Sequence, residues 1–319
     1  MPFEPKQFID DAVAQIRRTV RVGRAIVAVS GGVDSTVTAV LMNEALEKRC
    51  IAVFVDTGFM RKGEPESIRE LANKINMNLR FVDAKKKFYA ALKGVKDPEK
   101  KRKTIGELFI RIFEEIAKEE KAKFLGQGTL APDWIESGAG MRATIKTHHN
   151  VGGLPKGMKL KLIEPVRELY KDEVRKVGKE LGLSEKICNR QPFPGPGLAI
   201  RVIGEVVEEK VGIVREACAI VEEELEQAAA KGEMELPWQY FAVLLPSRSV
   251  GVLGDCRAYG YVVAVRAVYS VDAMTAHYAR IPDSILENIS NRITRELKEH
   301  VNRVVYDISS KPPACIEWE

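Results

Sequence analysis

Through the first 190 residues, mostly apolar runs alternate with stretches of helix length. Residues 5–20 carry apolar side chains at helical spacing, which predicts an amphipathic opening helix. Apolar runs with strand character follow at 25–29, 51–55, 79–82, 123–125 and 160–166. Such runs, separated by helices, are typical of parallel strands that are buried on both faces. We therefore expect a doubly wound α/β domain with a parallel five-stranded sheet over residues 1–190.

The pattern changes at residue 191. The segment 191–197 holds three prolines and two glycines, too many for a helix or a strand. Strands are then predicted at 198–203, 240–245, 261–268 and 301–308, with helices at 206–230 and 284–300. Grouped strands with few helices indicate a smaller α+β domain with a mixed or antiparallel sheet, over residues 191–319.

A glycine-rich loop, Ser30-Gly31-Gly32-Val33-Asp34-Ser35, stands between the first apolar strand and a helix-compatible stretch. Two glycines allow φ > 0 and a close approach, so that backbone N–H groups can converge on an anion. Ser30 and Ser35 add hydroxyl donors. Asp34 would repel a phosphate unless a divalent cation lay between them. The loop therefore predicts a phosphate site with a bound magnesium ion.

Two better-known phosphate motifs do not fit this loop. It lacks the Gly-Lys-Ser/Thr of a Walker A sequence, and it is not the dinucleotide fingerprint Gly-x-Gly-x-x-Gly. A simple tight turn is the alternative, but the flanking strand, both serines and the aspartate disfavour it. The hexapeptide resembles the signature of the PP-loop ATP pyrophosphatases. That resemblance implies cleavage of ATP between its α and β phosphates, with AMP transferred to a substrate oxygen.

Composition restricts the class of protein. The 319 residues include 50 Lys and Arg against 45 Asp and Glu, a mild excess that fits small anionic ligands better than nucleic acid. The five cysteines are dispersed, with no Cys-x-x-Cys pair, as in reduced intracellular proteins. No signal peptide and no membrane-length apolar run is visible. We expect a cytoplasmic protein that binds neither membrane nor nucleic acid.

Three polar segments outside the loop could carry chemistry. Residues 100–103 are all basic and near a helix start, so they are either a solvated run or a group that neutralises polyphosphate. Residues 146–156 combine His148 and His149 with a glycine hinge; two histidines make no metal site, but a mobile loop can bring such charges onto phosphates. The ending 309–319 carries Pro-Pro, Trp and spaced charges, so it is expected to fold back onto the protein.

Nearly the whole chain resembles one family, the ATP-pyrophosphatase portion of GMP synthetase. The matching segments keep one order along the chain: 30–35, 54–58, 126–129 with Pro132 and Asp133, 148–155, 192–198, 248–252 and 311–319. Seven matches in one order are far more specific than the hexapeptide alone. The resemblance implies a GMP synthase in which the O2 of XMP attacks the α-phosphate of ATP, pyrophosphate leaves, and ammonia then displaces AMP to give GMP.

The resemblance also implies roles for individual residues. ATP and pyrophosphate would be bound by Ser30, Gly31, Gly32, Val33, Asp34, Ser35, Thr36, Asp56, Gly58 and Gly126. Magnesium would be held by Asp34 and Asp133. Besides Asp34, the candidates for stabilising polyphosphate charge are Lys101, Lys103, His148, His149 and Lys156. XMP would be bound by Pro194, Gly195, Arg248, Lys311, Ile316 and Glu317. The family also implies a homodimer formed through the C-terminal domain.

One departure from many family members concerns glutamine. The chain starts with the helix before the PP-loop, and no cysteine stands in a Gly-x-Cys-x-Gly elbow. This resembles the ATP-pyrophosphatase subunit, or B subunit, of the split form familiar from archaea, which implies a separate glutaminase (glutamine amidotransferase) subunit as the ammonia source. Two other classes stay open: a tRNA-modifying or sulfur-transferring PP-loop enzyme, which would normally show Cys-x-x-Cys pairs or a basic RNA-binding appendage, and a non-catalytic nucleotide-binding protein, which intact Asp34 and both serines disfavour.

Overall fold

The computed structural model describes residues 3–131, 160–271 and 273–319. The chain divides into two compact units. Unit 1 comprises Met1–Asp56, Gly63–Ala84 and Glu107–Gly195, and unit 2 comprises Thr57–Lys62, Lys85–Gly106 and Pro196–Glu319. Each unit is therefore assembled from segments that are distant in sequence. Helix α5 (Pro98–Glu119) contributes its first turns to unit 2 and the rest to unit 1.

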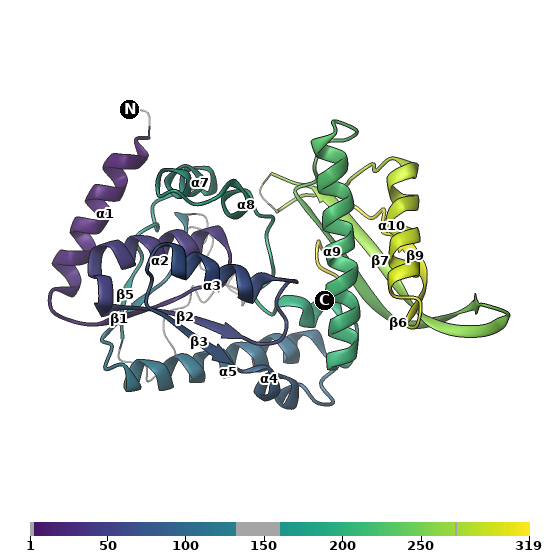
Figure 1. Cartoon of the computed structure of the whole chain (residues 1–319), viewed down its shortest axis with the longest axis horizontal. Coiled ribbons are helices and arrows are strands. Elements are labelled where there is room, and N and C mark those ends of the chain that lie inside the picture. The colour runs from purple at the N-terminus through teal and green to yellow at the C-terminus, as the bar shows by residue number, and fades with distance from the viewer. Residues whose placement is uncertain (1–2, 132–159, 272) are drawn as a thin grey trace. The chain divides into compact units, whose positions relative to one another are not determined.

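Unit 1 is built on a five-stranded sheet in the order β3-β2-β1-β4-β5, with every pair of neighbours parallel. This confirms the predicted doubly wound α/β fold. Helices α1, α2 and α7 pack together on one side of the sheet, and α5 lies on the other (Figure 1). The elements are α1 (Pro5–Val20), β1 (Ala25–Ala28), α2 (Val33–Leu46), β2 (Cys50–Asp56), α3 (Glu64–Lys74), β3 (Leu79–Asp83), β4 (Phe124–Gly126), β5 (Lys161–Ile163), α7 (Lys171–Glu180) and α8 (Glu185–Cys188).

The core of unit 1 explains the apolar runs of the sequence. All seven residues of β2 are buried, as a strand covered on both faces requires. Helix α2 is buried on nearly every side because α1, α7 and the sheet surround it. Its first turn, by contrast, carries the half-buried Asp34. The sheet thus fixes the start of α2 rigidly at the carboxyl end of β1.

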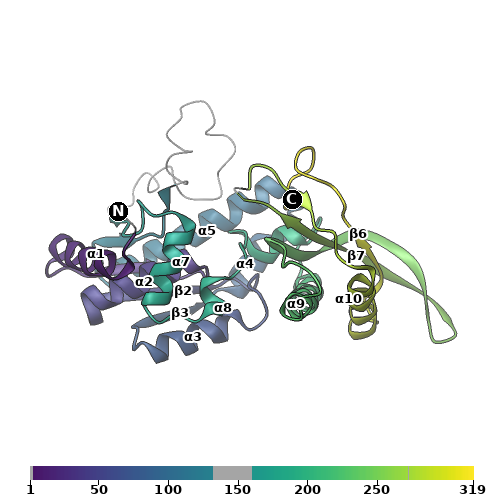
Figure 2. The same ribbon diagram turned by 90° about the horizontal axis from the view of Figure 1, so that it is seen from above.

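Unit 2 contains a four-stranded mixed sheet. Strand β7 pairs antiparallel with β6 and β8, and parallel with β9. Helices α9 and α10 pack side by side against this sheet (Figure 2). The elements are α4 (Lys85–Ala91), a 3-10 helix (Gly197–Arg201), α9 (Glu208–Ala230), β6 (Gln239–Leu253), β7 (Cys256–Tyr269), β8 (His277–Tyr278), α10 (Asp283–Glu296) and β9 (Val301–Tyr306).

One predicted strand of the C-terminal half was wrong, and two others were confirmed but are longer than predicted. The run 198–203 is mainly a buried 3-10 helix rather than a strand, since Gly197 turns the chain at φ +63° against the carbonyl group of Phe59. Strands β6 and β7 are much longer than predicted and form one hairpin through residues 246–260. Proline, serine and glycines interrupt the apolar pattern there, so only the backbone pairing reveals the strands. Among the described residues, no helix has both the length and the apolar character needed to cross a bilayer.

Candidate functional site

The hexapeptide 30–35, here called the pyrophosphate loop, is held in shape by its own hydroxyl groups. Gly31 has φ +81°, and Gly32 caps α2 in an extended conformation. The Ser30 and Ser35 Oγ atoms lie 2.9 Å apart, and Ser35 Oγ also donates to the Gly32 carbonyl oxygen at 3.1 Å. Thr36 Oγ1 donates to the same carbonyl at 2.8 Å. The loop is thus a preformed turn at the start of a helix.

The start of α2 offers binding groups for an anion. The first N–H groups of a helix have no intrahelical acceptor, and the helix dipole makes this end electropositive. The N-cap residue of α2 is Gly32, which has no side chain that could cap the helix. Backbone N–H groups at such an end are suited to phosphate oxygens.

Asp34 lies in the first turn of α2, and its two carboxylate oxygens have different surroundings. Its Oδ2 is 2.6 Å from the ammonium group of Lys171, the first residue of α7. Its Oδ1 is buried and has no hydrogen-bond partner among the described residues. A buried carboxylate oxygen without a partner is costly unless a ligand completes it. The arrangement fits a divalent cation, which prefers carboxylate oxygen.

The second predicted metal ligand, Asp133, lies outside the described residues. Within the described part of the chain, no three His, Cys, Asp or Glu side chains gather as a metal cluster. Magnesium in nucleotide sites is commonly bound by one or two carboxylates, with substrate phosphates and water as the other ligands. One carboxylate with a free oxygen therefore suits that kind of site.

The loop after β4 comes close to the pyrophosphate loop, which explains its glycines. A Cβ at Gly128 would lie about 3 Å from the backbone of Asp34 and Ser35. A Cβ at Gly126 would overlap the side chain of Met42 on α2. The Gly-Gln-Gly-Thr segment is therefore shaped by close packing beside the start of α2, and Gly126 stays a predicted ligand contact.

Of the two residues predicted to border the nucleoside, Asp56 is the last residue of β2 and Gly58 comes shortly after it. Asp56 is buried at the end of the strand, and its carbonyl accepts from the N–H of Ala84 at 2.9 Å. Gly58 belongs to unit 2 and has φ +81°. Its carbonyl accepts from the Arg215 guanidinium and from Tyr89 Oη at 3.3 Å. The backbone at Gly58 is therefore fixed by side chains of unit 2.

The predicted cationic residues lie in unlike surroundings. Lys101 is completely buried in unit 2, where its ammonium group bonds to the Val202 carbonyl at 2.8 Å and to the Glu319 carboxylate. Burial lowers the pKa of Lys101, and Glu319 partly offsets that effect. Lys103, two residues further along α5, is exposed. His148, His149 and Lys156 lie outside the described residues.

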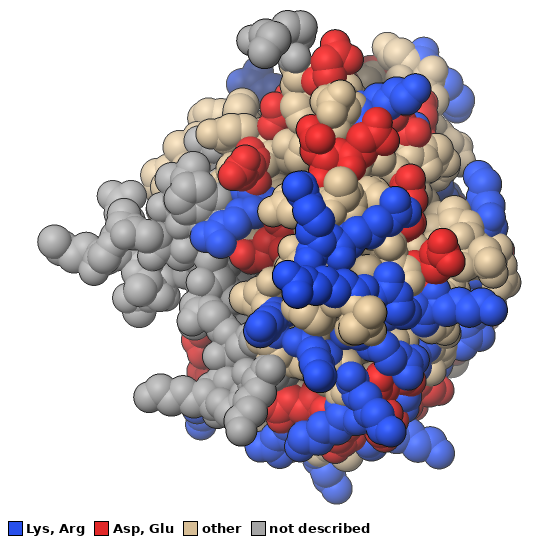
Figure 3. Space-filling view, turned by 90° about the vertical axis from the view of Figure 1, so that its left-hand side faces the viewer, with Lys and Arg blue, Asp and Glu red and all other residues tan. Residues whose placement is uncertain are grey.

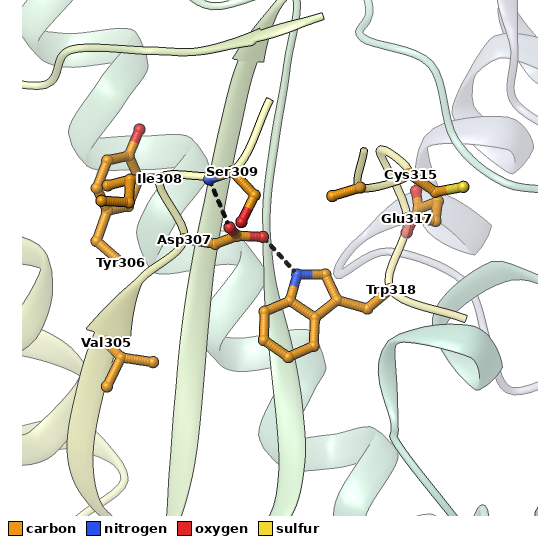
Figure 4. A pocket seen from close by; sticks show the side chains of 9 residues that line it. Val305, Tyr306, Asp307, Ile308, Ser309, Cys315, Glu317 and Trp318 are labelled. Carbon is orange, nitrogen blue, oxygen red and sulfur yellow. Dashed lines mark hydrogen bonds between the residues drawn. The ribbon is translucent and has the colours of Figure 1, made fainter. Parts of the chain in front are cut away.

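The C-terminal tail, residues 307–319, folds back onto unit 2 as expected and forms one wall of a pocket of about 590 Å³ (Figure 4). Asp307 and Trp318 are joined across the tail by a hydrogen bond of 2.9 Å from the indole Nε1. Two predicted XMP residues lie here: Glu317 lines the pocket, and Ile316 beside it is buried. The other lining residues are Val305, Tyr306, Ile308, Ser309, Ala314 and Cys315.

Buried arginines hold this tail in place. Arg201 is 1% exposed, lies over the Phe241 ring, and bonds to both carboxylate oxygens of Glu317 at 2.8 and 3.2 Å. Gln239 Nε2 adds a third bond to Glu317 at 3.0 Å. Arg266, fully buried on β7, donates to the backbone carbonyls of Ser309 and Cys315. Glu317 is thereby kept as an oriented acceptor.

The remaining predicted XMP residues are dispersed. Lys311, in the tail, donates through Nζ to the Ala273 carbonyl at 2.7 Å. Arg248 is exposed on β6, and its guanidinium lies 4.2 Å from the centre of the Tyr261 ring. Pro194 and Gly195 end unit 1. Lys311, Ile316 and Glu317 therefore belong to the tail, Arg248 lies on β6 of the same unit, and Pro194 and Gly195 belong to unit 1.

The positive surface of unit 1 lies away from the pyrophosphate loop. Figure 3 shows Lys and Arg gathered on the side where the parallel strands begin. Exposed cations in the segments before the strands are Arg21, Arg24, Lys48, Lys121, Lys123 and Lys161. Several follow helix C-termini, where cations are favourable. Because the pyrophosphate loop follows the carboxyl end of β1, this surface does not neutralise phosphates bound there.

Lys171, Arg190, Arg201 and Arg266 were missed as candidates from the sequence. Lys171 stands at a helix N-terminus, where a cation is unfavourable without a partner. Arg201 and Arg266 each interrupt an apolar run, Leu198–Ile203 and Tyr261–Val268. These irregularities were the available signals, since a buried charge requires a partner.

A parallel sheet that carries a glycine loop, a helix N-terminus and an unsatisfied carboxylate defines a nucleotide-binding α/β protein of the PP-loop class. The family model "NAD synthase" matches residues 5–115, and the model "GMP synthase C terminal domain" matches residues 223–318. The B subunit of the glutamine-hydrolyzing GMP synthase of Methanopyrus kandleri is 57% identical over 318 residues, which cover 99% of this chain and 100% of that protein. The chain belongs to the family of GMP synthase B subunits.

Other relatives agree. The B subunit from Thermococcus kodakarensis is 59% identical over 315 residues, 98% of this chain and 99% of that protein. The glutamine-hydrolyzing GMP synthase of Caldicellulosiruptor saccharolyticus is 56% identical over 320 residues, which cover 99% of this chain but only 62% of that longer protein.

Proposed function

We propose that this chain converts XMP to GMP at the expense of ATP, in two displacements. The O2 of XMP attacks the α-phosphorus of ATP. The bond between this phosphorus and the oxygen that bridges to the β-phosphate breaks, and pyrophosphate leaves. Ammonia then attacks C2 of adenylyl-XMP, the C2–O bond breaks, and AMP departs with that oxygen. Loss of a proton from the new amino group gives GMP.

The observation that carries this proposal is the pyrophosphate loop with its helix N-terminus and the free Asp34 oxygen. An in-line displacement at phosphorus needs mainly positioning and charge neutralisation. The N–H groups of residues 31–35 and the hydroxyls of Ser30 and Ser35 would hold the leaving pyrophosphate, while the Thr36 N–H makes the first hydrogen bond of α2, to the Gly32 carbonyl at 3.0 Å. Lys171, 2.6 Å from Asp34, supplies a positive charge beside it.

Magnesium fits the same place. Asp34 would bind it through the buried Oδ1 that has no described partner, and Asp133 remains the proposed second ligand. The bound ion would supply neutralisation of the polyphosphate charge. Asp56, Gly58 and Gly126 are proposed to border the nucleotide. Lys101, Lys103, His148, His149 and Lys156 stay proposed charge stabilisers.

XMP is proposed to bind at the C-terminal tail. Glu317 would accept hydrogen bonds from base N–H groups, and the bonds from Arg201 and Gln239 keep its carboxylate oriented for that purpose. Lys311 and Arg248 suit a 5′-phosphate, Lys as a point charge and Arg as a bidentate fork. The proposed remaining contacts are Pro194, Gly195 and Ile316.

Ammonia is proposed to come from a separate glutaminase subunit. The relatives are named as B subunits, which supports a second subunit, and so does the longer Caldicellulosiruptor protein, of which this chain covers 62%. We also propose a homodimer formed through residues 191–319, and a cytoplasmic location, which the five free thiols favour.

The test is to incubate the chain with ATP, magnesium, XMP and ammonium and to follow AMP, pyrophosphate and GMP. We expect AMP and GMP to form in equal amounts and only when XMP is present. Glutamine should replace ammonium only after a glutaminase subunit is added. AMP formation that does not depend on XMP would reject the proposed substrate.

A further inference from the structure

Gly31 of the pyrophosphate loop contacts two side chains of unit 1 that are distant in sequence, Glu64 and Arg190. Its carbonyl oxygen accepts a hydrogen bond of 3.1 Å from Arg190 Nη1. The same nitrogen lies 2.9 Å from the Glu64 Oε1 atom. A Cβ at residue 31 would overlap the Glu64 carboxylate. The loop backbone is therefore in direct contact with an Arg–Glu ion pair.

The Glu64 carboxylate is buried close to the pyrophosphate loop, so its negative charge can affect the binding of an anion there. Glu64 is the first residue of α3 and is 1% exposed. The helix dipole favours a carboxylate at this position. Yet the charge lies beside Gly31 of the loop that is proposed to receive the phosphates of ATP, and like charges repel strongly where water is excluded. A carboxylate buried here requires a compensating cation.

Arg190 is a cation paired with Glu64, and it also donates a hydrogen bond to the loop backbone. It follows α8, immediately before the proline-glycine segment 191–197, and is 21% exposed. One guanidinium nitrogen contacts both the carboxylate and the Gly31 carbonyl. The Gly32 N–H points opposite to the Gly31 carbonyl, because the C=O and the next N–H of a trans peptide point in opposite directions, so fixing that carbonyl also fixes the direction of this N–H.

We propose that Glu64 and Arg190 are positioning residues for ATP binding. Arg190 fixes the Gly31 carbonyl, and with it the direction of the loop N–H groups, and it neutralises a carboxylate that would otherwise repel the phosphates. The inference rests on the proposed use of this loop for ATP and pyrophosphate. It assigns a function to two residues outside the hexapeptide.

The experiment measures binding of Mg·ATP and of pyrophosphate to the full chain by calorimetry, without XMP, alongside thermal unfolding. The variants are Arg190→Gln, Glu64→Gln and the double variant. Arg24→Gln is the matched control, because Arg24 pairs with Glu120 at 2.9 Å at the amino ends of the strands. Arg190→Gln is expected to weaken both ligands on the order of 30-fold, because the loop loses the hydrogen bond to the Gly31 carbonyl and the buried Glu64 carboxylate loses a cation 2.9 Å away.

The double variant separates positioning from simple stabilisation. Removing the Glu64 charge as well should restore part of the affinity, roughly 3- to 10-fold, since the repulsion disappears while the Gly31 contact stays lost. In turnover, the KM for ATP should rise and the KM for XMP should stay constant. Arg190→Lys keeps the charge and should bind more tightly than Arg190→Gln, which provides a second test if Arg190→Gln folds poorly.

Two results would overturn the inference: a folded Arg190→Gln variant that binds Mg·ATP within twofold of the natural chain, or a double variant that binds no better than the single one. A lower melting temperature with unchanged affinities would show a purely structural ion pair. Because the binding and unfolding measurements use no XMP, they are independent of the GMP assay. Failure of XMP-dependent AMP formation would reject the proposed function and leave the result for the ion pair unaffected.

Discussion

The pyrophosphate loop of unit 1 and the C-terminal tail of unit 2 are held in shape by different kinds of interaction. The loop is shaped mainly by groups within seven residues, through the hydroxyls of Ser30, Ser35 and Thr36. The tail depends on buried cations that are distant in sequence. Arg201 and Glu317 are 116 residues apart, and Lys101 and Glu319 are separated by 218 residues.

This difference has consequences for robustness. A loop formed by local hydrogen bonds keeps its conformation as long as the strand before it and the helix after it are folded. The tail is bonded to three buried cations of unit 2, Lys101, Arg201 and Arg266, and a buried charge that loses its partner costs several kcal/mol. Substitutions in the loop should therefore impair chemistry with little loss of stability. Substitutions beneath the tail should impair stability and XMP binding together.

The largest expected effect is on catalysis, in Asp34→Asn. We expect XMP-dependent AMP formation to fall by at least about 100-fold, since a charge that stabilises the reacting phosphates is lost. Stability should change little, because the ion pair that Asp34 Oδ2 loses with Lys171 is partly exposed to solvent and such pairs contribute about 1 kcal/mol or less. AMP formation, XMP affinity and urea unfolding are measured together.

Asp10→Asn, at an exposed site on α1, is the control for Asp34→Asn. Turnover of Asp34→Asn close to that of the control would reject the metal-binding role. A large loss of stability would contradict the view that the loop is shaped by its own hydroxyls.

The second effect is on stability, in Arg266→Met. Three acceptors lose a buried donor: the carbonyls of Ser309 and Cys315, and Asp307 at 3.3 Å. We expect a loss of about 3 kcal/mol in the free energy of unfolding and a marked loss of XMP affinity. Urea unfolding and XMP calorimetry measure these two quantities.

Binding of Mg·ATP should be unchanged in Arg266→Met. The matched control is Arg257→Met, an exposed arginine on the same strand, which should alter neither quantity. If Arg266→Met kept full XMP affinity in spite of lower stability, the tail would not be the XMP site.

The same contrast explains what the sequence could reveal. The pyrophosphate loop and the opening helix were predictable because each is a single continuous segment with a recognisable pattern. The parallel sheet was predictable because each of its strands is a short apolar run between helices. The parallel five-stranded sheet with its helices was then confirmed. Family resemblance added the tail residues as candidates, but not the arginines that hold them.

The buried cations could not be identified because burial depends on the tertiary fold. Lys101 and Lys103 stand in one basic run, yet one is completely buried and the other exposed. Arg201 lies in an apolar run whose predicted strand is a 3-10 helix. Gly197 begins that helix with a positive φ. The need for glycine at this position becomes clear only from the structure, in which the Phe59 carbonyl oxygen leaves no room for a Cβ.

A third prediction concerns whether Lys101 serves the tail or the polyphosphate. If it tethers the tail, Lys101→Met and Glu319→Gln should each lower the free energy of unfolding by roughly 2 kcal/mol, and their effects should not add. Mg·ATP affinity should stay constant in both variants. Loss of ATP affinity in Lys101→Met alone would instead assign Lys101 to polyphosphate.

The pH dependence gives Lys101 a second signature. Burial lowers its pKa below the ordinary 10.5, with Glu319 offsetting part of this effect. Between the lowered value and 10.5 the unfolded chain binds more protons than the folded one, so this group makes stability rise with pH. The stability of the natural chain relative to Lys101→Met should therefore increase as pH approaches 10.5. A difference independent of pH would contradict the burial of the charged group.

The smallest expected effect is a change in labelling rate, and it tests the tail without a mutation. Cys256 and Cys315 are exposed, whereas Cys50, Cys188 and Cys218 are buried. Burial raises the pKa of Cys50 to about 12 and also raises the pKa values of Cys188 and Cys218. Because the thiolate is the reactive form, a thiol reagent at pH 8 should label two cysteines in the folded chain and five after unfolding.

XMP should then protect one of the two exposed thiols. Cys315 lines the tail pocket, whereas Cys256 begins β7 and is absent from that lining, so it serves as the internal control. At an XMP concentration ten times its Kd, only about one site in eleven is free, so labelling of Cys315 should slow about tenfold. Peptide mass spectrometry assigns each rate to its cysteine. Equal slowing of both thiols would indicate a general change in the fold, and no slowing of Cys315 would place XMP away from the tail.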